Sequence, residues 1–218
     1  MRFKVIVLTL FTASLVAGCT GVGGSASGGS SAPPLTECQA SGTNCAIGDT
    51  GPGGGKVFYD AGYAAPWGRY LEVAPDNWYN VEGDPSAIWC CRGALDQSVV
   101  PSTGIDIGTG KDNTQRIEAT VGNLPVTDEQ REGVGLPAWA YATGDHGGKS
   151  DWFLPSKEEL RWLYLNREAA RVSMSGSYWS SSQSADNNIY AWIVDFDSDK
   201  VYSSFKDLNN YVRPIRAF

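Results

Sequence analysis

The chain has 218 residues, 42% of them hydrophobic, and a formal net charge of −7. Its length fits one globular domain with a substantial core, preceded by a shorter terminal segment. The acidic balance argues against nucleic acid and anionic lipid surfaces as partners, because contact with phosphates requires a basic face.

The first residues, 1–18, have the pattern of a lipoprotein signal peptide. Arg2 and Lys4 precede an apolar stretch from Val5 to Ala17, and Leu-Val-Ala-Gly leads into Cys19. The stretch is shorter than the ~20 apolar residues of a membrane-spanning helix, but it fits a cleaved export signal. We therefore expect cleavage before Cys19 and transfer of diacylglycerol to its thiol, which anchors the chain to a membrane. The alternative is an ordinary signal peptide cut nearby, with a free thiol left behind.

Residues 19–36 are rich in Gly, Ser and Pro and predict a flexible stalk. Such a stalk has a mean reach of roughly 20–25 Å, at ~5–6 Å × √n. The globular domain is expected over residues 37–218. The lipid places it on the cell membrane or an outer membrane, facing the periplasm or the exterior.

Four cysteines follow the lipidated one, and an even number in an oxidising compartment suggests disulfides. Cys38 and Cys45 flank a turn-forming spacer and are the favoured pair. Cys90 and Cys91 are adjacent, so they form a vicinal bridge, or one of them reaches the first pair, or both are free. Neither metal nor cofactor is predicted: there is no Cys-x-x-Cys motif, and the acidic turn at residues 195–199 lacks the Gly and Glu of a calcium loop.

The N-terminal half of the domain predicts a hairpin and one weak helix. A glycine-rich run, 47–55, leads into a strand at Lys56–Tyr59, and a second apolar run follows at Tyr70–Ala74. A phosphate loop is not favoured, because Lys56 enters a strand and the Gly-Lys-Ser/Thr ending is missing. Asp112–Val121 has weak helical character, and Thr127–Gln130 has the form of a helix-capping box.

The strongest helix signal begins at Ser156. The run Ser-Lys-Glu-Glu places a hydroxyl at the N-cap and Glu159 three residues later, so each side chain covers an orphan amide of the first turn. Leu160, Leu163 and Tyr164 then recur at helical spacing and predict a face that docks on the core.

The last forty residues predict antiparallel strands. In Tyr190–Phe196 the even positions are expected to face inward, Asp197–Asp199 makes a turn, and Val201–Lys206 returns. Tyr211–Phe218 is expected to be a closing strand, with Pro214 at an edge or a bulge.

Five segments resemble the Lcl C-terminal domain family, in order and over nearly all of residues 45–218: Ile47–Gly54, Trp67–Pro75, Ser150–Leu160, Tyr178–Ser182 and Val212–Arg216. The resemblance implies a loop-rich α+β fold, similar to C-type lectins and sulfatase-modifying factors, with antiparallel strands and one or two prominent helices. It also implies, for the adhesin that names the family, binding of sulfated polysaccharide through a basic surface. The present chain is acidic and departs from that feature.

A binding or adhesion module without catalytic activity, for a glycan or a surface protein, is the favoured function. Aromatic residues in loops carry this hypothesis, because flat rings bury a large area at little entropic cost; they are Trp67, Trp78, Trp89 and Trp139. The simpler alternative for each tryptophan is a place in the core.

An enzyme is the second hypothesis. Asp145, His146, Lys149 and Asp151 share one polar loop in which the histidine has the chemistry of a general base. The run Leu-Pro-Ser-Lys-Glu-Glu-Leu is similar to one in formylglycine-generating enzymes. Those enzymes use two cysteines in the C-terminal part of the domain, whereas no cysteine follows Cys91 here, so a solvated loop is favoured. A structural envelope component is the third hypothesis.

Overall fold

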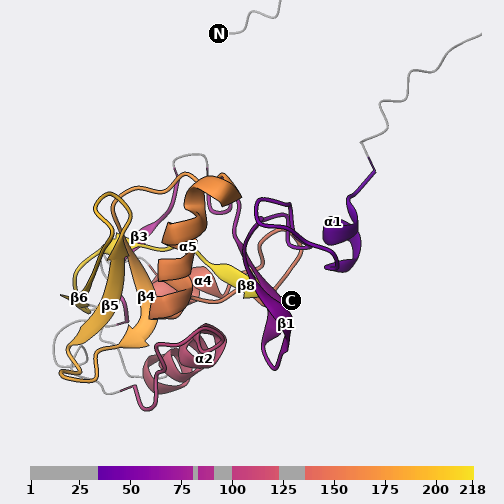
Figure 1. The fold of residues 1–218 in the computed structure, drawn as a ribbon. Coiled ribbons are helices and arrows are strands. Elements are labelled where there is room, and N and C mark those ends of the chain that lie inside the picture. The colour runs from indigo at the N-terminus through magenta and orange to yellow at the C-terminus, as the bar shows by residue number, and fades with distance from the viewer. Residues whose placement is uncertain (1–33, 81–82, 91–99, 123–135) are drawn as a thin grey trace, which may run out of the picture. The chain divides into compact units, whose positions relative to one another are not determined.

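The computed structural model describes residues 34–80, 83–90, 100–122 and 136–218. The predicted signal peptide, Cys19 and the stalk up to residue 33 lie outside these ranges, as do Cys91 and the capping box expected at residues 127–130. The described residues form helices and mostly antiparallel sheets, which confirms the α+β class (Figure 1). No helix in these ranges is long and apolar enough to cross a membrane.

The smaller sheet contains the predicted N-terminal hairpin. β1 (Lys56–Ala65) pairs antiparallel with β2 (Gly68–Val73), and β2 pairs antiparallel with β8 (Ile215–Ala217). The strand order is therefore β1-β2-β8. Phe58 of β1 and Leu71 of β2 are fully buried on the inner face of this sheet, which therefore forms one wall of the core.

The larger sheet has the order β3-β7-β4-β5-β6. Its strands are β3 (Ser86–Ala87), β4 (Ser177–Gln183), β5 (Tyr190–Asp195), β6 (Lys200–Phe205) and β7 (Asn210–Tyr211). The β5-β6 pair is antiparallel, as predicted, and β4, which the sequence analysis did not predict, pairs antiparallel with β5 and makes a short parallel contact with β7. The carboxylate of Asp195 accepts the N–H groups of residues 197 and 198, which closes the turn between β5 and β6.

One long helix connects the two sheets. α5 (Lys157–Ala170) packs on β1 of the smaller sheet and on β4 and β5 of the larger one, with Leu160 and Leu163 fully buried, as predicted. α2 (Gly110–Val121) packs on β4 and on α4 (Ala138–Ala142). The short α1 (Glu37–Ser41) precedes the smaller sheet.

The predicted alternation along β5 is wrong in part. Ala191 and Ile193, expected to face outward, are almost fully buried, whereas Trp192 is only half-buried. Val194 is fully buried on the opposite face. Both faces of β5 are covered. α5 packs on the face of Val194, and a cluster of buried residues around Trp179 packs on the face of Ala191 and Ile193.

The predicted single closing strand is also wrong. Residues 210–217 form two short strands, β7 in the larger sheet and β8 in the smaller one, with Pro214 between them. Proline has no N–H to donate to a strand ladder, so it is suited to the crossing point. The segment thus links the two sheets.

Two buried arginines fix this crossing segment. Arg213 Nε lies 2.8 Å from the carboxylate of Asp84, and both side chains are 3% exposed. Arg216 Nη1 lies 2.8 Å from the carboxylate of Glu72, which is fully buried. Burial raises the pKa of Glu72, and the ion pair with Arg216 opposes that rise. Breaking a buried pair of this kind costs about 3–5 kcal/mol, because one charge is left without its partner.

The expected Cys38–Cys45 disulfide is present. Cys90 is also disulfide-bonded, and Cys91 lies outside the described residues. Because Cys38 and Cys45 bond to each other, the possibility that Cys90 reaches this pair is wrong.

Candidate functional site

The candidate site is built on the capping box that begins α5. Ser156 Oγ accepts the N–H of Glu159 at 3.2 Å, and the Glu159 carboxylate accepts the N–H of Ser156 at 2.7 Å. Both residues are fully buried. The reciprocal pair is the one that the sequence predicts, and it satisfies two of the orphan amides of the first helical turn.

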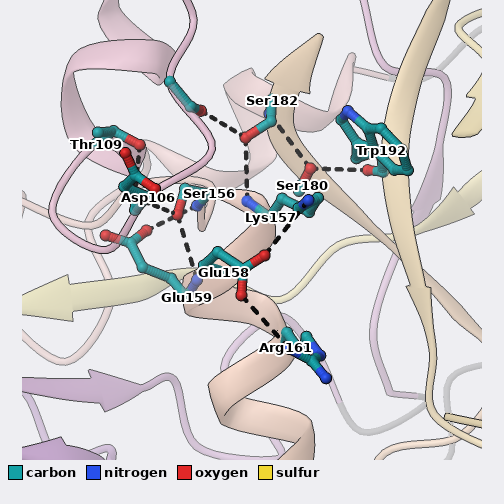
Figure 2. Close-up of polar contacts among 11 residues, drawn as sticks. Asp106, Thr109, Ser156, Lys157, Glu158, Glu159, Arg161, Ser180, Ser182 and Trp192 are labelled. Atoms are coloured by element: carbon teal, nitrogen blue, oxygen red, sulfur yellow. Dashed lines mark hydrogen bonds and ion pairs between the residues drawn. The ribbon is translucent and has the colours of Figure 1, made fainter. Parts of the chain in front are cut away.

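The same two side chains also hold the loop before α2. Ser156 Oγ donates to the carbonyl of Asp106 at 2.8 Å, and Glu159 Oε1 accepts the N–H of Gly108 at 2.7 Å. Figure 2 shows Ser156 between Asp106 and Glu159, with Thr109 beside them. The helix cap is therefore also a tertiary clamp, which fixes residues 106–108 against the start of α5.

Glu159 has no cationic partner among the described residues. Burial raises its pKa to about 7, and the N–H groups of Ser156, Gly108 and Gly110 oppose the rise. The side chain is thus poised between its charged and neutral forms near neutral pH, and a buried carboxyl with this property is often found at functional sites.

Two glycines allow the chain to approach this carboxyl. A side chain at Gly110 would collide with the Glu159 carboxylate, and one at Gly108 would collide with the indole ring of Trp67. Gly108 also has a φ of +89°, a conformation that favours glycine. The clamp thus connects α5 to Trp67: Glu159 holds Gly108, and Gly108 supports the indole ring.

Above this clamp lies a cavity of about 410 Å³, within the size range of small-ligand sites. Trp67 and Phe153 contribute aromatic surface, and α2 contributes polar side chains. Glu159 lies at its base. The complete lining is Pro66, Trp67, Gly108, Lys111, Asp112, Gln115, Phe153, Glu159 and Ala217. We call it the Trp67 cavity.

A row of aromatic rings continues from the cavity across β1 to α5. The ring centroids of Trp67 and Tyr59 are 6.3 Å apart, and those of Tyr59 and Trp162 are 5.4 Å apart in an edge-on contact. Trp162 is 38% exposed. An aromatic surface with polar groups beside it is the arrangement expected of a recognition site.

A second aromatic cluster surrounds His146. Its ring packs edge-on against Trp78, with centroids 4.7 Å apart, and Tyr79 packs edge-on against Tyr141. The Trp78 indole N–H donates to Asp84 at 2.6 Å. Trp78 is therefore half-buried and hydrogen-bonded to Asp84, the residue that pairs with Arg213.

The predicted polar loop does not assemble as a catalytic group in the described residues. Asp151 pairs with Arg216 instead of His146, while Asp145 is exposed and Lys149 forms a backbone bridge with His146. Burial lowers the pKa of His146, against the effects of the Tyr141 carbonyl and Asp145. The histidine is thus largely neutral at pH 7 and contacts aromatic rings on either side.

The other predicted tryptophans differ in position. Trp89 is fully buried and donates to the carbonyl of Ser180 at 2.7 Å, so its prediction as a ligand-binding residue is wrong. The ring is enclosed by the larger sheet and α4, a long-range contact that its loop-like sequence does not reveal. Trp139 lies on α4 at the other end of α2 from Trp67, beside Gly122.

Sequence reasoning singled out Trp67 but missed the other residues of the cavity. Glu159 was assigned only a capping role, and nothing marks Gly108 or Gln115 as neighbours of Trp67. Over the ranges that the structure covers, His, Cys, Asp and Glu side chains form no group of three able to hold a metal ion.

These features define an α+β domain with a recessed aromatic and polar site between two helices and a small sheet. Residues 127–216 match the family model described as the Lcl C-terminal domain. This part of the chain is thus similar to the Lcl C-terminal domain family, in agreement with the resemblance noted in the sequence. The match includes three of the five segments noted in the sequence, while Trp67 lies before it. No curated protein matches the chain.

Proposed function

We propose that the protein is a membrane-anchored, extracytoplasmic lipoprotein that displays a non-catalytic binding module, and that this module takes a glycan in the Trp67 cavity. The observation that carries the proposal is the indole ring of Trp67, which faces a ligand-sized space shared with the polar side chains of α2. Aromatic rings present flat apolar surface to a sugar ring, and Lys111, Asp112 and Gln115 supply donors and acceptors for its hydroxyl groups.

The construction of the cavity supports a binding role. Trp67 rests on Gly108, which is held by a fully buried carboxyl. A ring held in this way loses little conformational freedom when a ligand binds, and such preorganisation increases affinity.

A glycan array tests the binding role. The chain from residue 19 onward, with Cys19→Ser to prevent lipidation, is expected to bind a subset of glycans, and Trp67→Ala is expected to weaken that binding about tenfold or more. Tyr202→Ala is a matched control, because this tyrosine is 42% exposed on β6, outside the cavity lining. Binding that is equal in the Trp67→Ala variant and the parent would contradict the proposal, as would silence on the array.

The anchor is tested separately. Mass spectrometry of the protein extracted from cells is expected to show an acylated N-terminal residue at position 19, and Cys19→Ser is expected to release the protein from the membrane fraction. An intact leader, or an unmodified thiol at Cys19, would refute the membrane assignment and leave the cavity argument unaffected.

A further inference from the structure

In the part of the chain that the structure describes, two further hollows lie beside the Trp67 cavity along α2. The second, of about 290 Å³, is lined by Asp112, Gln115, Arg116 and Ala119. The third, of about 320 Å³, is lined by Gln115, Glu118, Ala119, Gly122 and Trp139. Gln115 lines all three, so the hollows are neighbours on one surface of the helix.

A tryptophan lies at each end of this surface. Trp67 packs on Gly108, two residues before α2, and the ring of Trp139 lies beside Gly122, which ends the helix. A helix of this length is about 18 Å long at 1.5 Å per residue. The two rings are thus separated by more than a single sugar unit can span.

Trp139 has a polar atom that is not satisfied. Its indole nitrogen is buried and has no hydrogen-bond partner among the described residues. A buried donor without an acceptor costs about 1–3 kcal/mol, so native structures seldom leave one. The ring itself lines the third hollow, with Cη2 close to Gly122, so it offers a flat apolar surface at this end of the helix.

The charges along the surface are balanced. Lys111 and Arg116 are cationic, Asp112 and Glu118 are anionic, and all four are exposed. Because charges of opposite sign alternate here, the surface has no extended positive potential, and it therefore does not select a polyanion. Its paired donors and acceptors suit the hydroxyl and amide groups of a neutral chain.

We infer that the binding surface is a groove that runs along α2 from Trp67 to Trp139, and that its ligand is an extended, uncharged oligosaccharide. This inference rests on the proposed function and adds the length and charge class of the ligand. We call the surface the α2 groove, formed by Trp67, Lys111, Gln115, Arg116, Ala119 and Trp139.

Oligosaccharides of increasing length test the groove. Isothermal titration calorimetry of the chain from residue 19 onward uses cello-oligosaccharides and chito-oligosaccharides, from the disaccharide to the hexasaccharide. Affinity is expected to rise about tenfold once the oligomer is long enough to reach both tryptophans, and then to level off. Trp139→Ala is expected to remove this rise.

A second variant keeps the test valid if Trp139→Ala fails to fold. Ala119 is exposed on α2, and Ala119→Gln introduces a longer side chain into two of the hollows with little change in helix propensity. It is expected to lower the affinity for long oligomers, whereas Tyr202→Ala leaves it unchanged.

The outcomes separate the groove from the proposed function. Affinity that does not change with length, or that is unaffected by both groove variants, overturns the groove, while dependence on Trp67 still supports the single-site function. If neither oligomer series binds, the inference of a neutral oligosaccharide is overturned. A ligand found on the array and lost in Trp67→Ala would then preserve the proposed function.

Discussion

Replacing Glu159 by glutamine tests the clamp under the Trp67 cavity. The buried carboxyl has a pKa of about 7 in the folded chain, compared with an ordinary value of 4.5. Folding therefore favours the protonated form, and the stabilisation from protonation is complete below pH 4.5 and is lost as the pH rises through 7. Each tenfold change in a protonation constant is worth about 1.4 kcal/mol, so the difference amounts to about 3 kcal/mol.

Glutamine cannot ionise, so the variant lacks this dependence on pH. Urea unfolding of the parent and of Glu159→Gln, between pH 4.5 and 8, measures it directly. The difference in unfolding free energy between the two proteins is expected to shift by about 3 kcal/mol across this range, in favour of the variant at high pH. Contributions from Glu72 and the other carboxyls are common to both proteins and cancel.

Glu158→Gln is the matched control, because Glu158 is the adjacent residue and its carboxylate forms ion pairs with Lys157 and Arg161 at the surface (Figure 2). If the difference between Glu159→Gln and the parent stayed constant from pH 4.5 to 8, the reasoning about burial would be refuted. A constant difference would mean that hydrogen bonds from the backbone offset the loss of water around the carboxylate.

Two further predictions concern Gly108 and the crossing segment. Gly108→Ala is expected to reduce the free energy of unfolding by about 2 kcal/mol or more, because alanine is strained at a φ of +89° and its methyl group collides with Trp67; an unchanged urea midpoint would contradict this packing. Arg213→Met is expected to cost about 3–5 kcal/mol, because Asp84 is left buried without its partner, and adding Asp84→Asn is expected to recover part of the loss in a double-mutant cycle. A loss in the double variant equal to the sum of the two single losses would show that the pair is not coupled.

Local sequence signals predicted several elements of this fold correctly. The reciprocal hydrogen bonds between Ser156 and Glu159 follow from residues three positions apart, and the hairpin of β5 and β6 follows from two apolar runs around an Asp-rich turn. Such features depend on neighbours along the chain, so the sequence contains the information that they need.

Features that depend on distant residues were not predictable. Glu159 and Gly108 are 51 positions apart, and nothing in the capping pattern indicates that the same carboxylate also holds a second loop. Trp89 lies in a segment that resembles an exposed loop, yet its ring is covered by residues 91 positions away. The hydrophobic periodicity of a sequence describes one helix or strand at a time. It does not reveal which other elements pack against that helix or strand.

The split of residues 210–217 between two sheets has a consequence for the order of folding. β7 pairs with β3 and β4, and β8 pairs with β2, so strands from early and late parts of the chain meet only when this stretch is in place. Contacts between residues so far apart in sequence form slowly, because a long loop must close before any contact is gained. The hairpins β1-β2 and β4-β5-β6 can each form on their own, but β3 and β8 find their neighbours only once residues 210–217 lie across both sheets, so this stretch sets the last step of assembly.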